Sequence, residues 1–218
     1  MKKQIYSKFD KHQISDLPRV LFGGRIIVIL SAGETESAVR YLLTHQILGI
    51  DTETRPSFRK GTSYSVALLQ VSTRDTCFLF RLNHTGMTPS LIQLLEDTTV
   101  PKIGLSLKDD FAMLSRRHNF KPGLFIDLQK EVKKIGVEDL SLQKLYANFF
   151  GEKISKAQRL SNWEADVLNE KQKRYAATDA WACIRLYEEF KRLSLTDDYD
   201  LIQVPDVVPT QDHTPQQL

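Results

Sequence analysis

The sequence has no long hydrophobic run. Its longest purely apolar stretch, residues 26–30, has only five residues, whereas a helix that spans a bilayer needs roughly 20. We therefore expect no membrane segment. The basic N-terminus lacks the apolar region of a secretory signal. Cys77 and Cys183 are the two cysteines, too few for a disulfide framework, so we expect reduced thiols in a cytoplasmic protein.

Other chemistries also lack their signals. The five histidines show no spacing typical of metal ligands, and no glycine-rich loop that could cradle a nucleotide phosphate is present. The sequence contains no internal repeat and no low-complexity tract. A length of 218 residues allows one ordinary domain with additional segments, but not two comfortable ones.

Charge of one sign is missing at the C-terminus. The chain carries a formal net charge of +3, from 30 Lys and Arg against 27 Asp and Glu. Residues 195–218 contain no Lys or Arg, and their acidic residues are Asp197, Asp198, Asp200, Asp206 and Asp212. With its prolines and its weak periodicity, this segment is expected to be an acidic, mobile tail. The remaining body is more basic, which is compatible either with a polyanionic partner or with an ordinary soluble surface.

The hydrophobic pattern predicts an α/β domain. Residues 1–24, which end in Gly23 and Gly24, are interpreted as an N-terminal extension. Short apolar or alternating runs predict strands at 26–30, 47–53, 64–72, 77–80, 101–107 and 124–126. Apolar spacing predicts helices at 34–46, 90–99, 108–118, 128–134, 139–149 and 169–192. The order indicates a mixed sheet, with an antiparallel meander over 47–80 and parallel strands added through helical crossovers.

One predicted strand ends in two acidic residues. Asp51 and Glu53 lie on the same side of this strand, because a strand alternates its faces, while Leu48 and Ile50 point to the other side. Two neighbouring carboxylates repel each other, and a divalent cation relieves the repulsion because hard cations prefer oxygen ligands. The alternative is a strand end that has reached solvent, where acidic residues cost little.

A third carboxylate lies on the apolar face of the last predicted helix. Asp179 falls within the stripe formed by Tyr175, Cys183, Leu186 and other apolar residues. A buried carboxylate persists only when it is paired or bound to metal, and Tyr175 lies one helical turn away on the same face. The alternative is a buried Asp that caps a neighbouring element.

A fourth carboxylate follows a strand-to-helix junction. Asp110 lies four residues after Ser106 and four before Leu114, so these residues share one side of the helix, and Asp109 points toward solvent. The alternative is that both acids are simply favoured by the dipole of the helix N-terminus.

Together these motifs resemble the DEDD 3′–5′ exonucleases. D-x-E on a strand, D-x-x-x-L at a strand-to-helix junction and Y-x-x-x-D on a late helix occur in that family's order, and the tyrosine is typical of the DEDDy subtype, which includes ribonuclease D and the Werner-syndrome exonuclease domain. The resemblance rests on Ile50–Glu53, Gly104–Leu114, Ser161–Trp163 and Tyr175–Ala180. It runs from about Arg25 to Phe190, within an expected domain of residues 25–194. We see neither a helicase nor room for helical nucleic-acid-binding repeats.

The resemblance implies a fold and a mechanism. The fold would be ribonuclease H-like, with a mixed central β-sheet flanked by α-helices. Asp51, Glu53, Asp110 and Asp179 would bind two divalent cations, Mg²⁺ or Mn²⁺, and Tyr175 would orient the attacking water. The activity would be metal-dependent hydrolysis from the 3′ end of a nucleic acid, which releases 5′-mononucleotides. The substrate would be a single strand or another exposed 3′ end, and a DNA substrate would favour a nucleoid or nuclear location.

Several residues are candidates for gripping this substrate. Basic residues follow the first motif or precede Asn162 and Tyr175, and some can contact phosphates. Aromatic residues can stack on bases, although burial in the core is their more common fate. The candidates are Thr54, Arg55, Ser106, Phe111, Arg159, Asn162 and Trp163.

Two other functions stay open at this stage. A catalytically silent nucleic-acid-binding or scaffolding protein could keep the same fold, although no carboxylate of the set is missing. An endonuclease of the wider ribonuclease H group is the second alternative, and the tyrosine motif argues against it. The sequence does not decide between DNA and RNA, nor does it predict an oligomeric state.

Overall fold

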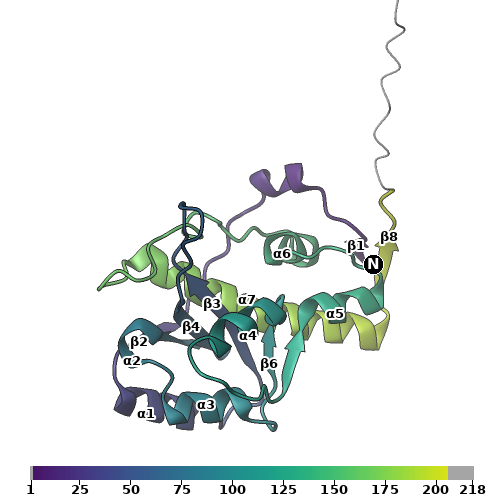
Figure 1. Ribbon diagram of the computed structural model, residues 1–218. Helices are drawn as coiled ribbons and strands as arrows, with labels where there is room; N and C mark the ends of the chain where they lie inside the picture. Colours follow the sequence, from purple (N-terminus) through teal and green to yellow (C-terminus); the bar gives the residue numbers. More distant parts are fainter. Residues whose placement is uncertain (1, 206–218) are drawn as a thin grey trace, which may run out of the picture.

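The computed structural model describes residues 2–205, and its centre is a six-stranded mixed sheet (Figure 1). The strands lie in the order β2-β5-β4-β3-β6-β7. β3, β4 and β5 form an antiparallel meander, and β2, β6 and β7 are added in parallel. The strands are Arg25–Ile29 (β2), Leu48–Thr54 (β3), Val66–Ser72 (β4), Thr76–Arg81 (β5), Lys102–Gly104 (β6) and Phe125–Asp127 (β7). The predicted mixed sheet is confirmed.

Helices cover both faces of this sheet, because the side chains of each strand alternate between the faces. On one face, Leu48 and Ile50 of β3 pack with apolar residues of α1, α3 and α4. The other face is covered by α7, a helix of 27 residues, with α5 and α6 beside it. The helices are Ala32–Leu42 (α1), Leu82–Thr85 (α2), Pro89–Glu96 (α3), Leu107–Ser115 (α4), Leu128–Val132 (α5), Leu142–Phe150 (α6) and Glu170–Thr196 (α7), with 3-10 turns at Lys11–Asp16 (η1) and Lys133–Ile135 (η2). Within residues 2–205, none of the helices has both the length and the apolar character needed to cross a membrane.

The expectation of a mobile tail is wrong for residues 199–202. These residues form strand β8 (Tyr199–Ile202), which pairs in parallel with β1 (Lys3–Tyr6). Both strands were missed because four residues offer too few alternations for a pattern to be detected, and because their partners lie at opposite ends of the chain. Residues 206–218, the rest of the predicted tail, lie outside the described residues.

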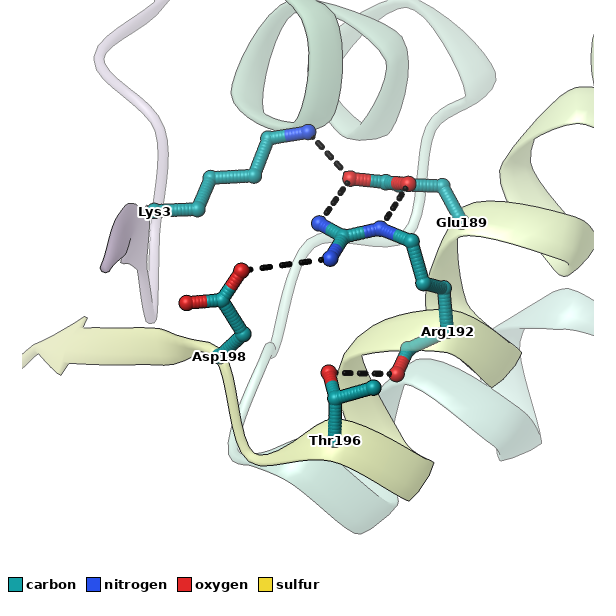
Figure 2. Close-up of polar contacts among 5 residues, drawn as sticks. All are labelled: Lys3, Glu189, Arg192, Thr196 and Asp198. Carbon is teal, nitrogen blue, oxygen red and sulfur yellow. Dashed lines mark hydrogen bonds and ion pairs between the residues drawn. The ribbon is translucent and has the colours of Figure 1, made fainter. Parts of the chain in front are cut away.

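A charged cluster secures this pairing (Figure 2). Glu189 of α7 accepts hydrogen bonds from Lys3 of β1 and from both Nε and Nη2 of Arg192, each of the latter at 2.9 Å. Arg192 also reaches Asp198, just before β8, at 3.3 Å. These contacts, with the bonds from Arg192 contributing most, lower the pKa of Glu189 to about 2. Glu189 is therefore ionised at neutral pH and, together with Arg192, joins the segments around β1 and β8 to α7.

The predicted N-terminal extension is packed against the domain. It starts beside Glu189 near the end of α7 and returns along the helix toward its beginning. There the backbone N–H of Phe22 donates to Oγ1 of Thr178 at 3.0 Å, and the Phe22 ring is buried. The backbone of Val20 bonds to the carbonyl of Lys153 at 3.0 Å. Residues 3–24 thus contribute to the core, although their mixed composition gave no sign of it.

The approach of α7 to the sheet depends on a glycine. A Cβ added to Gly49 of β3 would lie 1.9 Å from the carbonyl oxygen of Ala180. Such a distance is far inside van der Waals contact, and the obstacle is backbone that cannot rotate away. Gly49 therefore allows α7 to lie directly on β3, at the height of Asp51 and Asp179.

Gly49→Ala should destabilise the protein, because α7 must move away from β3 to make room. We expect a loss of about 1–3 kcal/mol in the free energy of unfolding, measured by chemical denaturation. Gly33→Ala is the matched control, because a Cβ at this position of α1 meets nothing within 4 Å. The control should be neutral or stabilising by up to about 1 kcal/mol. Equal stabilities of the two variants would contradict this account of the packing.

Candidate active site

Three carboxylates from two elements converge beneath α7. Asp51 and Glu53 come from β3, and Asp179 comes from the middle of α7. One oxygen from each of the three lies within 4.8 Å of the others. Glu53 and Asp179 are buried, at 8% and 7% exposure, and Asp51 is partly buried. The structure thus brings Asp51, Glu53 and Asp179 together, and their role as metal ligands stays a prediction.

Local structure explains why these side chains meet. Gly49, Asp51 and Glu53 occupy alternate positions of β3 and therefore face the same side of the sheet. The pairing of β3 with β4 is irregular between Glu53 and Thr54; such a bulge bends a strand and redirects its side chains. On the facing helix, Asp179 lies next to Ala180, whose carbonyl is adjacent to Gly49. The close contact of helix and strand thus sets the spacing of the cluster.

Tyr175 is the neighbour of Asp179 on α7. The Tyr175 hydroxyl forms a hydrogen bond with Asp179, and its ring packs on Trp163 with centroids 6.0 Å apart. Burial first, and then the charge of Asp179, raise the pKa of Tyr175. The phenol is therefore protonated at neutral pH and can donate its hydrogen bond to Asp179.

Burial and mutual repulsion raise the pKa values of the carboxyl groups. Burial, with the charge of Asp51 next in size, raises the pKa of Glu53 to about 10. Burial raises the pKa of Asp179 to about 7 against the hydrogen bond from Tyr175, which lowers it. Burial, followed by the charges of Asp179 and Asp110, holds the pKa of Asp51 well above its usual range. Without a cation, this cluster favours protons over negative charge.

Asp110 lies at the edge of the cluster. It is not one of the three residues whose oxygens gather within 4.8 Å; instead it accepts a hydrogen bond from Oγ1 of Thr52. Burial raises the pKa of Asp110 to about 6, while the bond from Thr52 lowers it. Its charge nevertheless acts on Asp51 and Glu53. Asp109 is exposed, as the sequence predicts.

The junction that carries Asp110 is held by a residue that the sequence reasoning missed. Asp127 accepts from the backbone N–H groups of Ser106 and Leu107, each at 3.1 Å. It also accepts from the N–H of Gln129 and so caps α5. Ser106 has a left-handed backbone, with φ of 61°, which is unfavourable for a residue with a side chain. An Asp before a helix is a recognisable N-cap, but nothing in the sequence indicates its second role.

The donor set fits a divalent cation. Oδ1 of Asp179 is buried without a hydrogen-bond partner, and so are both amide atoms of Gln70, the residue opposite Asp51 on β4. No ion pair among the described residues joins Asp51, Glu53 or Asp179 to a Lys or Arg. Buried polar atoms are normally partnered, and clustered carboxylates are the ligands that hard cations prefer. A cation would supply both the missing partner and the missing positive charge.

Basic residues of the segment before α7 lie near the cluster. The charge of Lys156 lowers the pKa of Asp179, and the charge of Arg159 lowers that of Glu53, although burial outweighs both effects. Both side chains are exposed. Two exposed cations are thus close enough to the acidic cluster to act on its carboxyl groups.

A second missed residue holds this segment in place. Arg81 of β5 is 1% exposed and donates to the carbonyl oxygens of Ala165 and Asp166, the latter at 3.3 Å. Asn83 adds a bond to the carbonyl of Glu164 at 3.4 Å. No sequence signal marks Arg81, because its partners are backbone atoms far along the chain. The loop before α7 is therefore anchored on the sheet.

The candidate substrate contacts lie in different places. Arg55 and Asn162 line a pocket of about 470 Å³ between the loop after β3 and the loop before α7. Arg55 bridges these loops by an ion pair with Glu164 at 3.3 Å, and it stacks on Tyr64. Thr54, at the end of β3, is partly buried beside them. Nothing in the sequence indicated that Tyr64 lines this pocket or that Glu164 pairs with Arg55.

The structure corrects the prediction for Trp163. Its ring is fully buried at 0% exposure between α7 and the sheet, so no base can stack on it, and it instead supports Tyr175. Phe111 is partly buried against Phe120 and Phe125, and it lines an open pocket beside α4 and β7. Because Phe111 lines this pocket, its ring can still be reached by a substrate.

Comparisons with known proteins identify a family. The model of a family described as 3'-5' exonuclease matches residues 26–194. A protein of Arabidopsis thaliana named 3'-5' exonuclease is 31% identical over 194 residues, which cover 82% of this chain and 67% of that protein. The bifunctional 3'-5' exonuclease/ATP-dependent helicase WRN of Mus musculus is 30% identical over 191 residues, which cover 83% of this chain but only 14% of that protein.

A solved structure shows the same fold. RNase D of Escherichia coli superposes with a TM-score of 0.68 at 18% sequence identity, over 80% of this chain and 47% of that chain. The ribonuclease H-like fold expected from the resemblance is therefore confirmed, as is the resemblance to ribonuclease D and to the Werner exonuclease domain. By the family match and the relatives together, this chain belongs to the 3'-5' exonuclease family of hydrolases.

Proposed function

We propose that this protein shortens nucleic acid strands from their 3′ ends by hydrolysis and releases 5′-mononucleotides. The observation that carries the proposal is the convergence of Asp51, Glu53 and Asp179, with oxygens within 4.8 Å of one another in a site that no Lys or Arg of the described residues neutralises. Burying such a cluster of carboxylates costs free energy unless the cluster binds a cation. Family membership supports the direction of cleavage.

Asp51, Glu53 and Asp179 would hold the divalent cations, with Asp110 as the fourth ligand. When bound, Mg²⁺ or Mn²⁺ would acidify a bound water and stabilise the charge on the attacking and leaving oxygens. Two such ions are proposed because four carboxylates supply enough negative charge for a pair. The proposed role of Asp110 has the least support from the spacing, since it lies outside the group of three.

Tyr175 would orient the attacking water. Its raised pKa keeps the hydroxyl protonated, and its bond to Asp179 together with the packing of Trp163 fixes the direction of the ring. An oriented donor next to the reacting atoms lowers the barrier by positioning, without a proton transfer of its own.

The substrate would be a strand with an exposed 3′ end. The cationic side chains of Lys156 and Arg159 next to the acidic cluster support a polyanionic substrate. A solved neighbour, Trypanosoma brucei RNase D, was determined in complex with the RNA U12. Digestion of matched DNA and RNA oligonucleotides side by side would choose between the two substrates, and a circular strand would reveal any internal cutting.

Asp51→Ala should abolish shortening of a 5′-labelled strand in Mg²⁺ or Mn²⁺, because it removes a central carboxylate of the cluster. Products are resolved on a denaturing gel. Asp109→Ala is the matched control, since Asp109 is exposed and lies outside the group of three carboxylates, and it should retain the wild-type rate. Persistent activity in Asp51→Ala would contradict the assignment of the carboxylate cluster as the active site. Strand binding without any shortening by the wild type would instead favour the silent binding protein.

Tyr175→Phe should lower kcat and leave KM nearly unchanged, because only the hydroxyl that orients the water is lost. Loss of one positioned donor at a reacting centre costs about 10²–10³ in rate. Stabilisation of the variant by Mg²⁺, followed by thermal melting, should stay at the wild-type level because the carboxylates remain. An unchanged kcat would show that Tyr175 has no such role.

Divalent cations should stabilise the protein, and more so as pH rises. The folded pKa values of about 6, 7 and 10 for Asp110, Asp179 and Glu53 lie above those of the unfolded chain. The metal-free fold therefore binds extra protons and loses stability as pH climbs through this window. Mg²⁺ should consequently raise the melting temperature more at about pH 8.5 than at about pH 5. At the lower pH all three carboxyl groups are below their folded pKa values, so bound protons compete with the cation.

Asp179→Asn tests the origin of this effect. It should raise the melting temperature of the metal-free protein at alkaline pH, because a buried charge is removed, and it should weaken the shift caused by Mg²⁺. Asp109→Asn should change neither value. A shift with Mg²⁺ that does not depend on pH or on Asp179 would place the cation elsewhere.

A further inference from the structure

A basic groove lies at the beginning of α7, beside the acidic cluster. It is a cavity of about 350 Å³, and its polar lining consists of Arg19, Gln158, Glu170, Lys171 and Arg174. Three of these side chains are cationic. Arg19, Lys171 and Arg174 are all exposed, so their charges are available to a molecule in solution. We use the name basic groove for this cavity.

The groove is assembled from three separate parts of the chain. Lys171 and Arg174 lie one turn apart on α7 and therefore share a face. Gln158 comes from the loop before α7. Arg19 comes from the N-terminal segment, which is fixed there by a bridge to Lys153 in which the N–H of Lys153 donates to the carbonyl of Pro18 at 2.8 Å. The matched family region begins at residue 26, so Arg19 is a contribution from outside it.

The cations of the groove are not neutralised by neighbouring acids. Within residues 2–205, the ion pairs include none that involves Arg19, Lys171 or Arg174. Glu170, the carboxylate of the lining, is paired with Lys173 instead. By contrast, the exposed Arg192 of α7 is paired with Glu189, and Glu188 of α7 is paired with Arg74 of the turn between β4 and β5. The groove is thus locally positive and open to an anionic ligand.

The groove continues from the acidic cluster. Gln158 lies between Lys156 and Arg159, whose charges act on Asp179 and Glu53. On α7, Arg174 is the residue before Tyr175, and Lys171 is one turn earlier. The loop before α7 and the first turns of α7 therefore carry cations both near the carboxylates and in the groove. A polymer with regularly spaced negative charges matches such a surface.

We propose that the basic groove binds the phosphate backbone of the substrate strand on the 5′ side of the bond that is cut. This proposal rests on the proposed function, since a strand whose 3′ end occupies the carboxylate cluster must extend its remaining phosphates away from it. Arg19, Lys171 and Arg174 bind these phosphates without regard to sequence, because they contact charge and not base edges. The N-terminal segment thereby becomes part of the substrate site.

The test compares strand binding by two doubly substituted proteins. Arg19→Glu/Lys171→Glu reverses two charges of the groove. Lys121→Glu/Lys191→Glu makes the same change in net charge at exposed positions; Lys191 lies roughly 30 Å along α7 from Lys171. All proteins carry Asp51→Ala to prevent cleavage. Fluorescence anisotropy measures the Kd of a labelled single strand of about 20 nucleotides and of a dinucleotide, over a range of salt concentrations.

The groove variant should bind the long strand about tenfold more weakly, and the slope of log K against log salt should fall by about 0.7 for each lost phosphate contact. Dinucleotide binding and the melting temperature should match the control. Equal affinity and equal salt slope in the two variants would overturn the proposal.

The two proposals fail separately. Shortening by the proteins without Asp51→Ala is followed in parallel on the same strands. If the wild-type protein binds through the groove but shortens nothing, the proposed function is contradicted and the proposed binding role of the groove stands. If the groove variant binds as the wild type does and the wild type shortens the strand, the binding role of the groove is contradicted and the proposed function stands.

Discussion

Close packing of α7 on β3 is the constraint on which the site depends. The carbonyl of Ala180 occupies the space where a side chain at residue 49 would stand, and this contact places Asp179 beside Asp51 and Glu53. The resulting proximity of three carboxylates is unfavourable by itself, as their raised pKa values show. The apolar packing of the sheet and its helices outweighs that cost. The fold thus holds in place an arrangement that its own electrostatics would disperse.

Sequence alone predicted most of this architecture. Every predicted strand and helix is present, because apolar residues within its own segment mark each one, and the carboxylates were found from their positions on those elements. Interactions between distant segments were not predictable. β1 and β8 are short, and Arg81 and Asp127 act on backbone groups whose proximity exists only in the fold. Trp163 was a candidate for base stacking, with burial as its more common fate, and its full burial makes it a support for Tyr175.

Charge is distributed around the site in two zones. The carboxylates are buried and lack cationic partners, whereas Lys156, Arg159 and the residues of the basic groove are exposed around them. Buried carboxylates can bind cations, and the exposed cationic side chains attract a negatively charged ligand toward them. The small formal charge of the whole chain conceals this separation, because it averages the buried acids, the acidic C-terminal segment and the basic surface into +3.

The pairing of β1 with β8 has a consequence for biosynthesis. Lys3 of β1 aligns with Tyr199 of β8, so β1 cannot pair until residues 199–202 have been synthesised. Contacts of such high sequence separation form late, since closing a long loop is entropically costly. Until then the N-terminal segment, including Phe22 and Arg19, has no finished α7 to lie on. The six-stranded sheet can therefore form before the N-terminal segment, with Arg19, is fixed beside α7.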